Sequence, residues 1–311
     1  MTDDTRTVTV RVPATTANLG PGFDTLGLPL SLYDELTVTA LPEPGLEVIV
    51  EGVGADDVPR DASNLVVSSI AYVYNAVGQP LPGLRLHAVN GIPHGRGLGS
   101  SGAAVVSGIV AARSLLEGIV DISSADLLRI ATEIEGHPDN VAPSLFGGLT
   151  IAWLDEQGPQ YKKLIVHRGV SPVVFVPSFT MSTKLARSLQ PESVPHQDAI
   201  FNVSRSALLI AALTQSPELM MAATEDKLHQ SYRAAAMPET DALVRMLRAE
   251  GFAAVVSGAG PSVLVLADGH AGHRGAVAAG PAAAGPCAAG DPGPPARSGA
   301  AARRCRRTSS R

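Results

Sequence analysis

A glycine-rich stretch over residues 93–103, Pro-His-Gly-Arg-Gly-Leu-Gly-Ser-Ser-Gly-Ala, constrains this chain more than any other segment. Gly95, Gly97 and Gly99 stand at alternate positions, so the backbone can take positive φ angles and approach a ligand closely. Apolar residues recur at helical spacing over residues 105–116, which predicts a helix directly after the loop. Such a loop directs amide N–H groups and the positive end of a helix dipole at one point, which favours an anion, most often a phosphate. A flexible glycine turn capped by serine is the alternative.

Two better-known nucleotide motifs do not fit this stretch. Residues 97–102 match the pattern G-x-G-x-x-G, but a dinucleotide-binding loop needs a strand that runs straight into the first glycine. Residues 93–96 intervene here, and Asp121, the acidic residue at about the right distance, follows a helix rather than a strand. A P-loop requires Gly-Lys-Ser/Thr, whereas the first lysine of the chain is Lys162.

Composition limits the class of protein. A chain of 311 residues can form two domains with proper cores. The N-terminus is acidic and leads into a predicted strand, so we expect no signal peptide. The most apolar run, residues 101–120, contains Arg113 and Glu117, so we expect a buried helix and no membrane span. Cys287 and Cys305 are too few for a disulfide framework or a cysteine metal cluster. These features predict a cytoplasmic protein without membrane partners.

Basic residues gather at the C-terminal end. Of 24 Lys and Arg and 29 Asp and Glu, seven Arg and one Asp follow Asp268, so residues 1–268 carry a net charge of −11. No basic patch with aromatic residues occurs in that part, so we expect no nucleic-acid partner.

Near the N-terminus, residues 7–12 alternate apolar and polar and predict a half-buried strand that leads into turn-forming residues 13–27. Within that run, Asp24 can accept a hydrogen bond from a ligand ammonium, and Asn18 offers both a donor and an acceptor. A local Asx turn is the structural alternative. Residues 36–40 and 46–50 are predicted as a hairpin-like pair of strands.

A predicted helix over residues 121–135 ends in the sequence Glu-Gly-His-Pro-Asp-Asn, residues 135–140. The carboxylates of Glu133 and Glu135 at this end oppose the helix dipole, and a cation partner would compensate them. A second glycine-rich turn, residues 257–262, lies between two predicted strands and is either a phosphate-side loop or a tight turn.

Three of these stretches, residues 13–27, 93–103 and 257–262, together resemble the three motifs of the GHMP kinases, which phosphorylate hydroxyl groups of small molecules with ATP. The resemblance covers about residues 7–268 and is strongest to the homoserine kinase branch, through residues 17–24, 135–143, 194–202 and 231–233. It implies an α+β fold with two domains: an N-terminal ATP-binding domain similar to ribosomal protein S5 (residues 1–165) and a C-terminal ferredoxin-like α/β sandwich (residues 166–268).

The resemblance also implies roles for individual residues. Asn64 would lie near adenine, and the ATP phosphates would be bound by Pro93, His94, Gly95, Arg96, Gly97, Leu98, Gly99, Ser100, Ser101, Gly102 and Ala103. Ser101 and Glu135 would be the Mg²⁺ ligands, with Glu133 the less favoured carboxylate, and Ser101, Glu135 and Asn140 would be catalytic. The amino-acid substrate would be held by Asn18, Asp24, His137, Asn140, Arg187 and Arg233.

The chemistry of this set suits a zwitterion that carries a hydroxyl group. Two arginines suit an α-carboxylate, and Asp24 suits an α-ammonium. Asp139 has the side chain of a general base, but no lysine partner of the mevalonate-kinase type is evident, so a structural role is favoured.

The implied reaction is ATP- and Mg²⁺-dependent phosphorylation of L-homoserine to O-phospho-L-homoserine, by a homodimer. A GHMP kinase for another small alcohol, and a nucleotide-binding protein impaired in catalysis by its C-terminus, are the alternatives.

The C-terminal tail departs from the family pattern. Residues 269–311 are almost entirely Gly, Ala, Pro and Arg, with Val277 as the single branched aliphatic residue. Such a composition cannot bury enough apolar surface to become ordered, so we expect a disordered tail and an incomplete C-terminal domain. It is typical of a GC-rich gene translated in a shifted frame, in which case both cysteines are incidental; a genuine disordered basic tail is the alternative.

Overall fold

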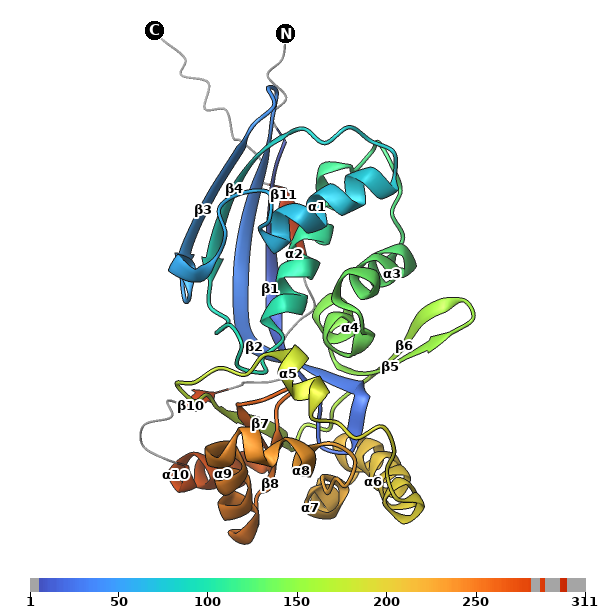
Figure 1. The fold of residues 1–311 in the computed structure, drawn as a ribbon, viewed down its shortest axis with the longest axis vertical. Helices are drawn as coiled ribbons and strands as arrows, with labels where there is room; N and C mark the ends of the chain where they lie inside the picture. Colours follow the sequence, from blue (N-terminus) through green and yellow to red (C-terminus); the bar gives the residue numbers. More distant parts are fainter. Residues whose placement is uncertain (1–5, 281–285, 289–296, 301–311) are drawn as a thin grey trace, which may run out of the picture.

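The computed structural model describes residues 6–280, 286–288 and 297–300, and its two halves are stacked along the long axis of the molecule (Figure 1). The N-terminal half holds a mixed sheet in the order β11-β1-β2-β4-β3, with β5 paired to β2 and β6 to β5. Its strands are β1 (Thr7–Asn18), β2 (Gly22–Leu41), β3 (Leu46–Gly52), β4 (Gly83–Asn90), β5 (Leu149–Asp155), β6 (Gly158–Leu164) and β11 (Arg297–Ala300).

Four helices cover one face of this sheet (Figure 1): α1 (Leu65–Ala76), α2 (Ser100–Leu115), α3 (Ser124–Glu135) and α4 (Pro138–Phe146). The predicted alternation in the first strand is confirmed, because Val8, Val10 and Val12 are buried against these helices. The helix predicted after the glycine-rich loop is also confirmed as α2, which is the central helix of the core: Val105 and Ile109 are both fully buried.

The predicted hairpin between residues 36–40 and 46–50 is wrong. Strand β4 lies between them, antiparallel to β2 and parallel to β3. The short connection at residues 42–45 is compatible with a hairpin. However, β4, the partner of both strands, comes about 40 residues later, after α1, so the local sequence cannot indicate this pairing.

The C-terminal half contains an antiparallel sheet in the order β10-β7-β9-β8, with helices on both faces. Alternate residues serve the two faces: Val174 and Leu264 join the main core, whereas Val173 and Val265 face a separate cluster with α9 and α10. The strands are β7 (Val170–Phe175), β8 (Ala253–Val256), β9 (Val263–Asp268) and β10 (Pro286–Ala288); the helices are α5 (Thr183–Ser188), α6 (His196–Thr214), α7 (Met220–Ala223), α8 (Gln230–Arg233), α9 (Pro238–Ala249) and α10 (Gly269–Ala279). Short 3-10 helices occupy Ala55–Asp57, Pro217–Leu219 and Ala234–Ala236.

The structure differs from the expected disordered tail at its start, because residues 269–279 form α10. Alanine is the strongest helix former, and it lets the helix lie close to the sheet. Ala276 is fully buried, and Val277 packs beside it on the cluster that contains Phe175, Leu247 and Phe252. Beyond α10, only β10 and β11 are described, as edge strands paired to β7 and β1; the expectation for residues 281–285, 289–296 and 301–311, with Cys305, lies outside the described residues.

The packing of α10 generates a stability prediction. Ala276→Asp places a carboxylate in the apolar cluster, so we expect the free energy of unfolding to fall by about 2–4 kcal/mol. The matched control is Ala278→Asp, an exposed position of the same helix, for which we expect about 0.5 kcal/mol or less. Urea unfolding of both variants measures the difference, and equal effects would mean that α10 does not pack on the sheet.

Candidate active site

The glycine-rich loop enters α2 with the geometry of an anion site. Gly95, Gly97 and Gly99 have φ angles of 62°, 72° and 68°, a region that side chains with a Cβ rarely adopt. Gly99 is the N-cap residue of α2 and supplies no side-chain cap. The first amide groups of the helix therefore have no side-chain acceptor at their own cap, and they lie beside a cavity that Ser100 and Ser101 line.

The glycines are also required because neighbouring backbone and side chains approach closely. A Cβ on Gly97 would collide with the carbonyl oxygen of Ser257, and one on Gly99 would collide with Thr15 Oγ1. Ser257 Oγ lies 2.7 Å from the carbonyl oxygen of Gly97 and 2.9 Å from Thr16 Oγ1. The loop is thus held between the first strand and the Ser257–Ser262 turn. These contacts bring together three segments that are far apart in the sequence.

A cavity of about 180 Å³ opens at this point, between the two halves of the molecule. It brings together every residue that the sequence assigns to catalysis, the metal or the substrate: Asn18, Asp24, Ser101, Glu135, His137, Asn140, Arg187 and Arg233. The cavity is also lined by residues around α5 that the sequence analysis did not assign to a site: Met181, Ser182, Thr183 and Ala186. The lining turn Gly258–Gly260 was predicted only as either a phosphate-side loop or a tight turn.

Ser101 and Glu135 are paired in this cavity. Ser101 Oγ donates to Glu135 Oε2 at 2.7 Å, although the residues are 34 positions apart. Burial raises the pKa of Glu135 and the hydrogen bond from Ser101 partly opposes this, so the carboxylate lacks a full charge partner in the protein. Glu133, in contrast, points away and accepts hydrogen bonds from Tyr72 at 2.8 Å and from Arg129 at 2.9 Å.

The oxygen atoms of Ser101 and Glu135 fit a hard cation such as Mg²⁺, which binds few protein oxygens and takes its other ligands from water and phosphate. Within the described residues, no group of three or more His, Cys, Asp and Glu side chains could hold a metal by itself.

Asp24 and Arg187 form a two-pronged ion pair across the cavity mouth, with both N···O distances 2.9 Å. Arg233 lies deeper and is only 2% exposed; its Nη1 donates to the carbonyl oxygen of Gly258 at 3.1 Å. Its Nε has no hydrogen-bond partner among the described residues, and burial lowers the pKa of this guanidinium. The three charges can all reach a small ligand, and Arg233 has unused donor capacity.

The remaining polar groups come from the start of α4. Asn140 Oδ1 accepts a hydrogen bond from Thr15 Oγ1 at 2.9 Å, which fixes the amide with its N–H groups on the other side. His137 Nδ1 lies 2.5 Å from Asp139 Oδ1. Burial lowers the pKa of His137, but the hydrogen bond and the charge of Asp139 outweigh it, so the pKa is raised. Asp139 is only 2% exposed, and its Oδ1 is taken up by the contact with His137.

A second cavity of about 300 Å³ adjoins the first and shares Ser100 and Ser101 with it. Besides the polar side chains of Asp34, Glu35, Asp57, Asn64, Asn90 and His94, its walls are apolar, which suits a flat ring such as a nucleotide base. These walls come from Leu36, Val48, Val50, Val58, Pro59, Leu65, Val66, Leu86 and Ala88, none of which the sequence analysis assigned to the site because scattered core-type residues carry no motif.

Two polar residues shape this second cavity. Asn64 lines it, but its Oδ1 caps α1 by accepting from Val66 N at 2.9 Å, and its Nδ2 donates to the carbonyl of Pro59 at 2.8 Å. Asp34, which the sequence analysis missed, accepts from the backbone N–H groups of Gly91 at 2.8 Å and Ile92 at 2.9 Å, and burial raises its pKa. Both residues thus fix backbone around the cavity.

Not every residue of the glycine-rich stretch lines a cavity. His94 lines the second cavity, and Gly95, Gly97, Gly99, Ser100 and Ser101 line the first. The guanidinium of Arg96 turns away and donates to the carbonyls of Pro177 at 2.9 Å and Phe179 at 2.5 Å. Leu98 and Ala103 are 1% exposed and belong to the core, and Pro93 and Gly102 lie outside both linings.

Comparison with known proteins places this arrangement. Residues 64–148 match the model of the GHMP kinases N terminal domain, and residues 205–279 match that of the GHMP kinases C terminal domain. A homoserine kinase of Clavibacter michiganensis subsp. michiganensis is 74% identical over 84% of this chain and 83% of its own length. The chain belongs to the homoserine kinase family of the GHMP kinases. It is therefore a kinase and uses ATP.

Other homoserine kinases agree with this assignment. The homoserine kinase of Leifsonia xyli subsp. xyli is 69% identical over 84% of this chain and 81% of its own length. The crystal structure of homoserine kinase from Cytophaga hutchinsonii is 27% identical, covers 90% of both chains and has a TM-score of 0.79. The predicted α+β fold of the GHMP kinases is confirmed. The C-terminal family match runs to residue 279 and so includes α10.

The helices of the described part of the chain are all too short or too polar to cross a membrane. The apolar run at residues 101–120 is the buried helix α2 and its C-terminal turn, as predicted.

The close contacts of the loop generate a prediction on nucleotide binding. Gly99→Ala places a Cβ against Thr15 at a positive φ, so we expect it to lower the free energy of unfolding by more than about 1 kcal/mol and to raise the KM for ATP. The matched control is Gly118→Ala, at a φ of 80° with open space around the new Cβ, where only the backbone strain remains. Equal effects of the two substitutions would show that loop packing is unimportant.

Proposed function

We propose that this chain transfers the γ-phosphoryl group of ATP to the side-chain hydroxyl of L-homoserine, which yields O-phospho-L-homoserine and ADP. The observation that carries the proposal is the meeting of the two cavities at Ser100 and Ser101, with apolar walls on one side and a carboxylate–arginine set on the other. The family assignment supplies the named substrate, and the charges of the first cavity suit its zwitterion.

In this proposal, the nucleotide lies with its base in the second cavity and its phosphates toward the first. The base fits the second cavity, and the phosphates fit the glycine-rich loop, where the amide groups at the start of α2 can donate to phosphate oxygens. Ser101 and Glu135 would hold Mg²⁺. When bound, this ion neutralises charge that develops on the phosphate oxygens during transfer.

The amino acid would occupy the mouth of the first cavity. Its ammonium takes the place of the Arg187 guanidinium at Asp24, and its carboxylate takes the place of Asp24 at Arg187, with Arg233 as a second donor. Asn18 and His137 line the same space and limit how the substrate can turn. The hydroxyl is thereby directed toward Ser101 and the phosphate loop.

The protein groups contribute mainly by position. Phosphoryl transfer passes through a loose transition state, so holding the hydroxyl in line with the phosphate supplies much of the acceleration. Asn140, fixed by Thr15, offers amide donors to the first cavity. Asp139 orients His137 through their hydrogen bond, and we assign it this structural role rather than that of a base.

The proposal extends to the whole chain. We take residues 1–165 as the N-terminal domain and start the C-terminal domain at residue 166, in the connection between β6 and β7. The C-terminal domain then extends past residue 268, the end expected from the sequence, because α10 packs on its sheet. We further propose that the enzyme works in the cytoplasm as a homodimer. Support for a dimer comes from the family resemblance of the sequence.

The first experiment is ADP release by the full chain with ATP and Mg²⁺. We expect ADP with L-homoserine, and less than about a hundredth of that rate with 4-hydroxybutanoate or 3-aminopropan-1-ol, which each lack one charge of the zwitterion. Comparable rates with these alcohols would point to a kinase for another small alcohol. Bound ATP without any turnover would instead indicate a nucleotide-binding protein.

The metal assignment generates a further prediction with an internal control. Glu135→Gln removes a charged oxygen ligand, so we expect kcat to fall by about 100-fold and the Mg²⁺ concentration for half-maximal rate to rise. Glu133→Gln, two positions away in the same helix but bonded to Tyr72 and Arg129, should stay within about twofold of the unaltered chain. An unchanged Mg²⁺ dependence in Glu135→Gln would contradict the assignment.

A further inference from the structure

Residues 18–24 include Asp24, the proposed partner of the substrate ammonium, and their backbone is partly strained. Asn18, Leu19 and Asp24 have φ angles of 70°, 50° and 52°, and Gly20 between them has 86°. Positive φ costs a residue such as Leu19 about 1 kcal/mol or more, whereas Gly, Asn and Asp tolerate it better. The turn is therefore strained mainly at Leu19, and contacts from outside help to keep it in this conformation. Asn18 helps from within, because its Oδ1 accepts from Asp24 N at 2.9 Å.

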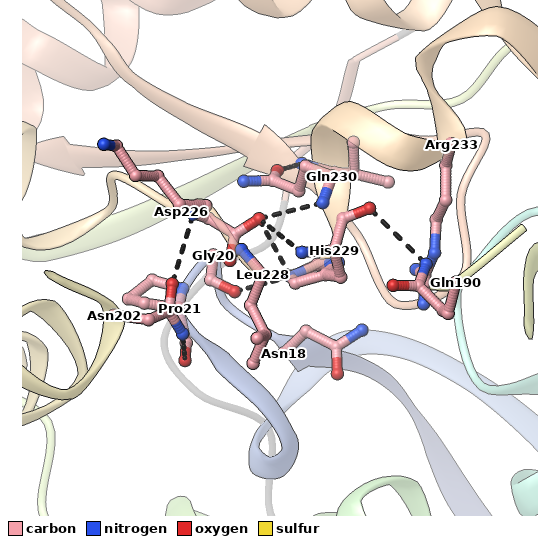
Figure 2. A network of polar contacts seen from close by, with 12 residues as sticks. Asn18, Gly20, Pro21, Gln190, Asn202, Asp226, Leu228, His229, Gln230 and Arg233 are labelled. Carbon is pink, nitrogen blue, oxygen red and sulfur yellow. Dashed lines mark hydrogen bonds and ion pairs between the residues drawn. The ribbon is translucent and has the colours of Figure 1, made fainter. Parts of the chain in front are cut away.

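A buried histidine of the C-terminal half provides the external hold (Figure 2). His229 is fully buried, and its Nε2 lies 2.7 Å from the carbonyl oxygen of Gly20. Its ring also stacks on Phe23, with centroids 4.8 Å apart and an interplanar angle of 17°. Phe23 directly precedes Asp24, so the imidazole contacts the turn at Gly20 and again next to Asp24.

His229 is itself fixed by an acidic residue. Asp226, whose side chain is buried, accepts from the backbone N–H groups of Leu228 at 3.0 Å, His229 at 3.1 Å and Gln230 at 2.8 Å (Figure 2). These bonds make residues 226–230 a rigid turn that leads into α8 and Arg233. The backbone of His229 is therefore held in place by the Asp226 side chain.

The contacts also determine the protonation of His229. The carbonyl of Gly20 can only accept, so Nε2 carries the proton. Nδ1 is buried with no hydrogen-bond partner among the described residues. Burial lowers the pKa of this side chain, although Asp226 Oδ2, 3.7 Å from Nε2, opposes the shift. A neutral imidazole outside both cavities is not a catalytic base but a donor and a stacking surface.

We propose that His229 is a positioning residue for homoserine: its neutral imidazole holds the strained turn from Asn18 to Asp24 through Gly20 and Phe23, and so places the Asp24 carboxylate. This inference rests on the proposed function. Asn202 Nδ2 and Ser206 Oγ of α6 bond the carbonyl of Pro21 at 2.9 and 2.6 Å, but they hold only the middle of the turn.

The test separates the hydrogen bond from the stack. His229→Phe keeps an aromatic ring on Phe23 and loses the donor to Gly20, whereas His229→Gln keeps a donor of similar reach and loses the ring. We expect His229→Phe to raise the KM for L-homoserine about tenfold, with kcat and the KM for ATP within about twofold. His229→Gln should recover most of the homoserine KM. His87→Phe and His87→Gln, on the exposed face of β4, are the matched controls and should leave all three constants unchanged.

Thermal melting of each variant accompanies the kinetics, because a buried substitution can unfold the chain. An unchanged homoserine KM in a folded His229→Phe would overturn the role of His229 and leave the proposed function intact. If His229→Phe does not fold, His229→Gln decides: a normal melt with a raised homoserine KM would also overturn the role of the hydrogen bond. Absence of homoserine-dependent ADP in the unaltered chain would overturn the proposed function and this inference together.

Discussion

The contact of the turn between β8 and β9 with two distant loops is the interaction on which the site depends. Ser257 Oγ bonds the carbonyl of Gly97 in the phosphate loop, while Gly258 N donates to the carbonyl of Ala17. The carbonyl of Gly258 in turn accepts from Asn18 and Arg233. One short turn therefore sets the distance between the phosphate loop, the strand that leads to the substrate turn and the buried arginine, and neither half of the chain forms the site alone.

This dependence links the site to the stability of the C-terminal half. The residues with positive φ at 18–24 belong to the N-terminal half by sequence, but groups from α6, His229 and Gly258 hold them. The same half relies on α10 to cover Phe175 and Phe252 on the outer face of its sheet. An alanine-rich helix can do this because the cluster needs a close apolar surface rather than large side chains.

Local features of the sequence predicted the lining of the first cavity better than the order of the strands. Gly97, Gly99 and the start of α2 could be inferred because their requirements are local: positive φ, a helix cap and a dipole. The unfavourable place at a helix end pointed to Glu133 and Glu135 together, and the family resemblance then chose Glu135 and assigned Arg187 and Arg233. Three features could not be inferred: the apolar second cavity, the insertion of β4 between β2 and β3, and the hydrogen bond from His229 to Gly20. Each of them joins residues that lie far apart in the sequence and whose contact no motif indicates.

Under the proposed function, the ion pair of Asp24 and Arg187 would let the site select a zwitterion. Both side chains are partly exposed, 36% and 41%, so their mutual attraction is worth only about 0–1 kcal/mol. A ligand with both charges replaces each partner by a new one and adds Arg233, so no charge is left unpaired. A ligand with one charge separates the pair and satisfies only half of it, and the remaining carboxylate or guanidinium then loses both its partner and part of its water. Under this proposal, selectivity would arise from the cost of the unpaired charge more than from the strength of any single contact.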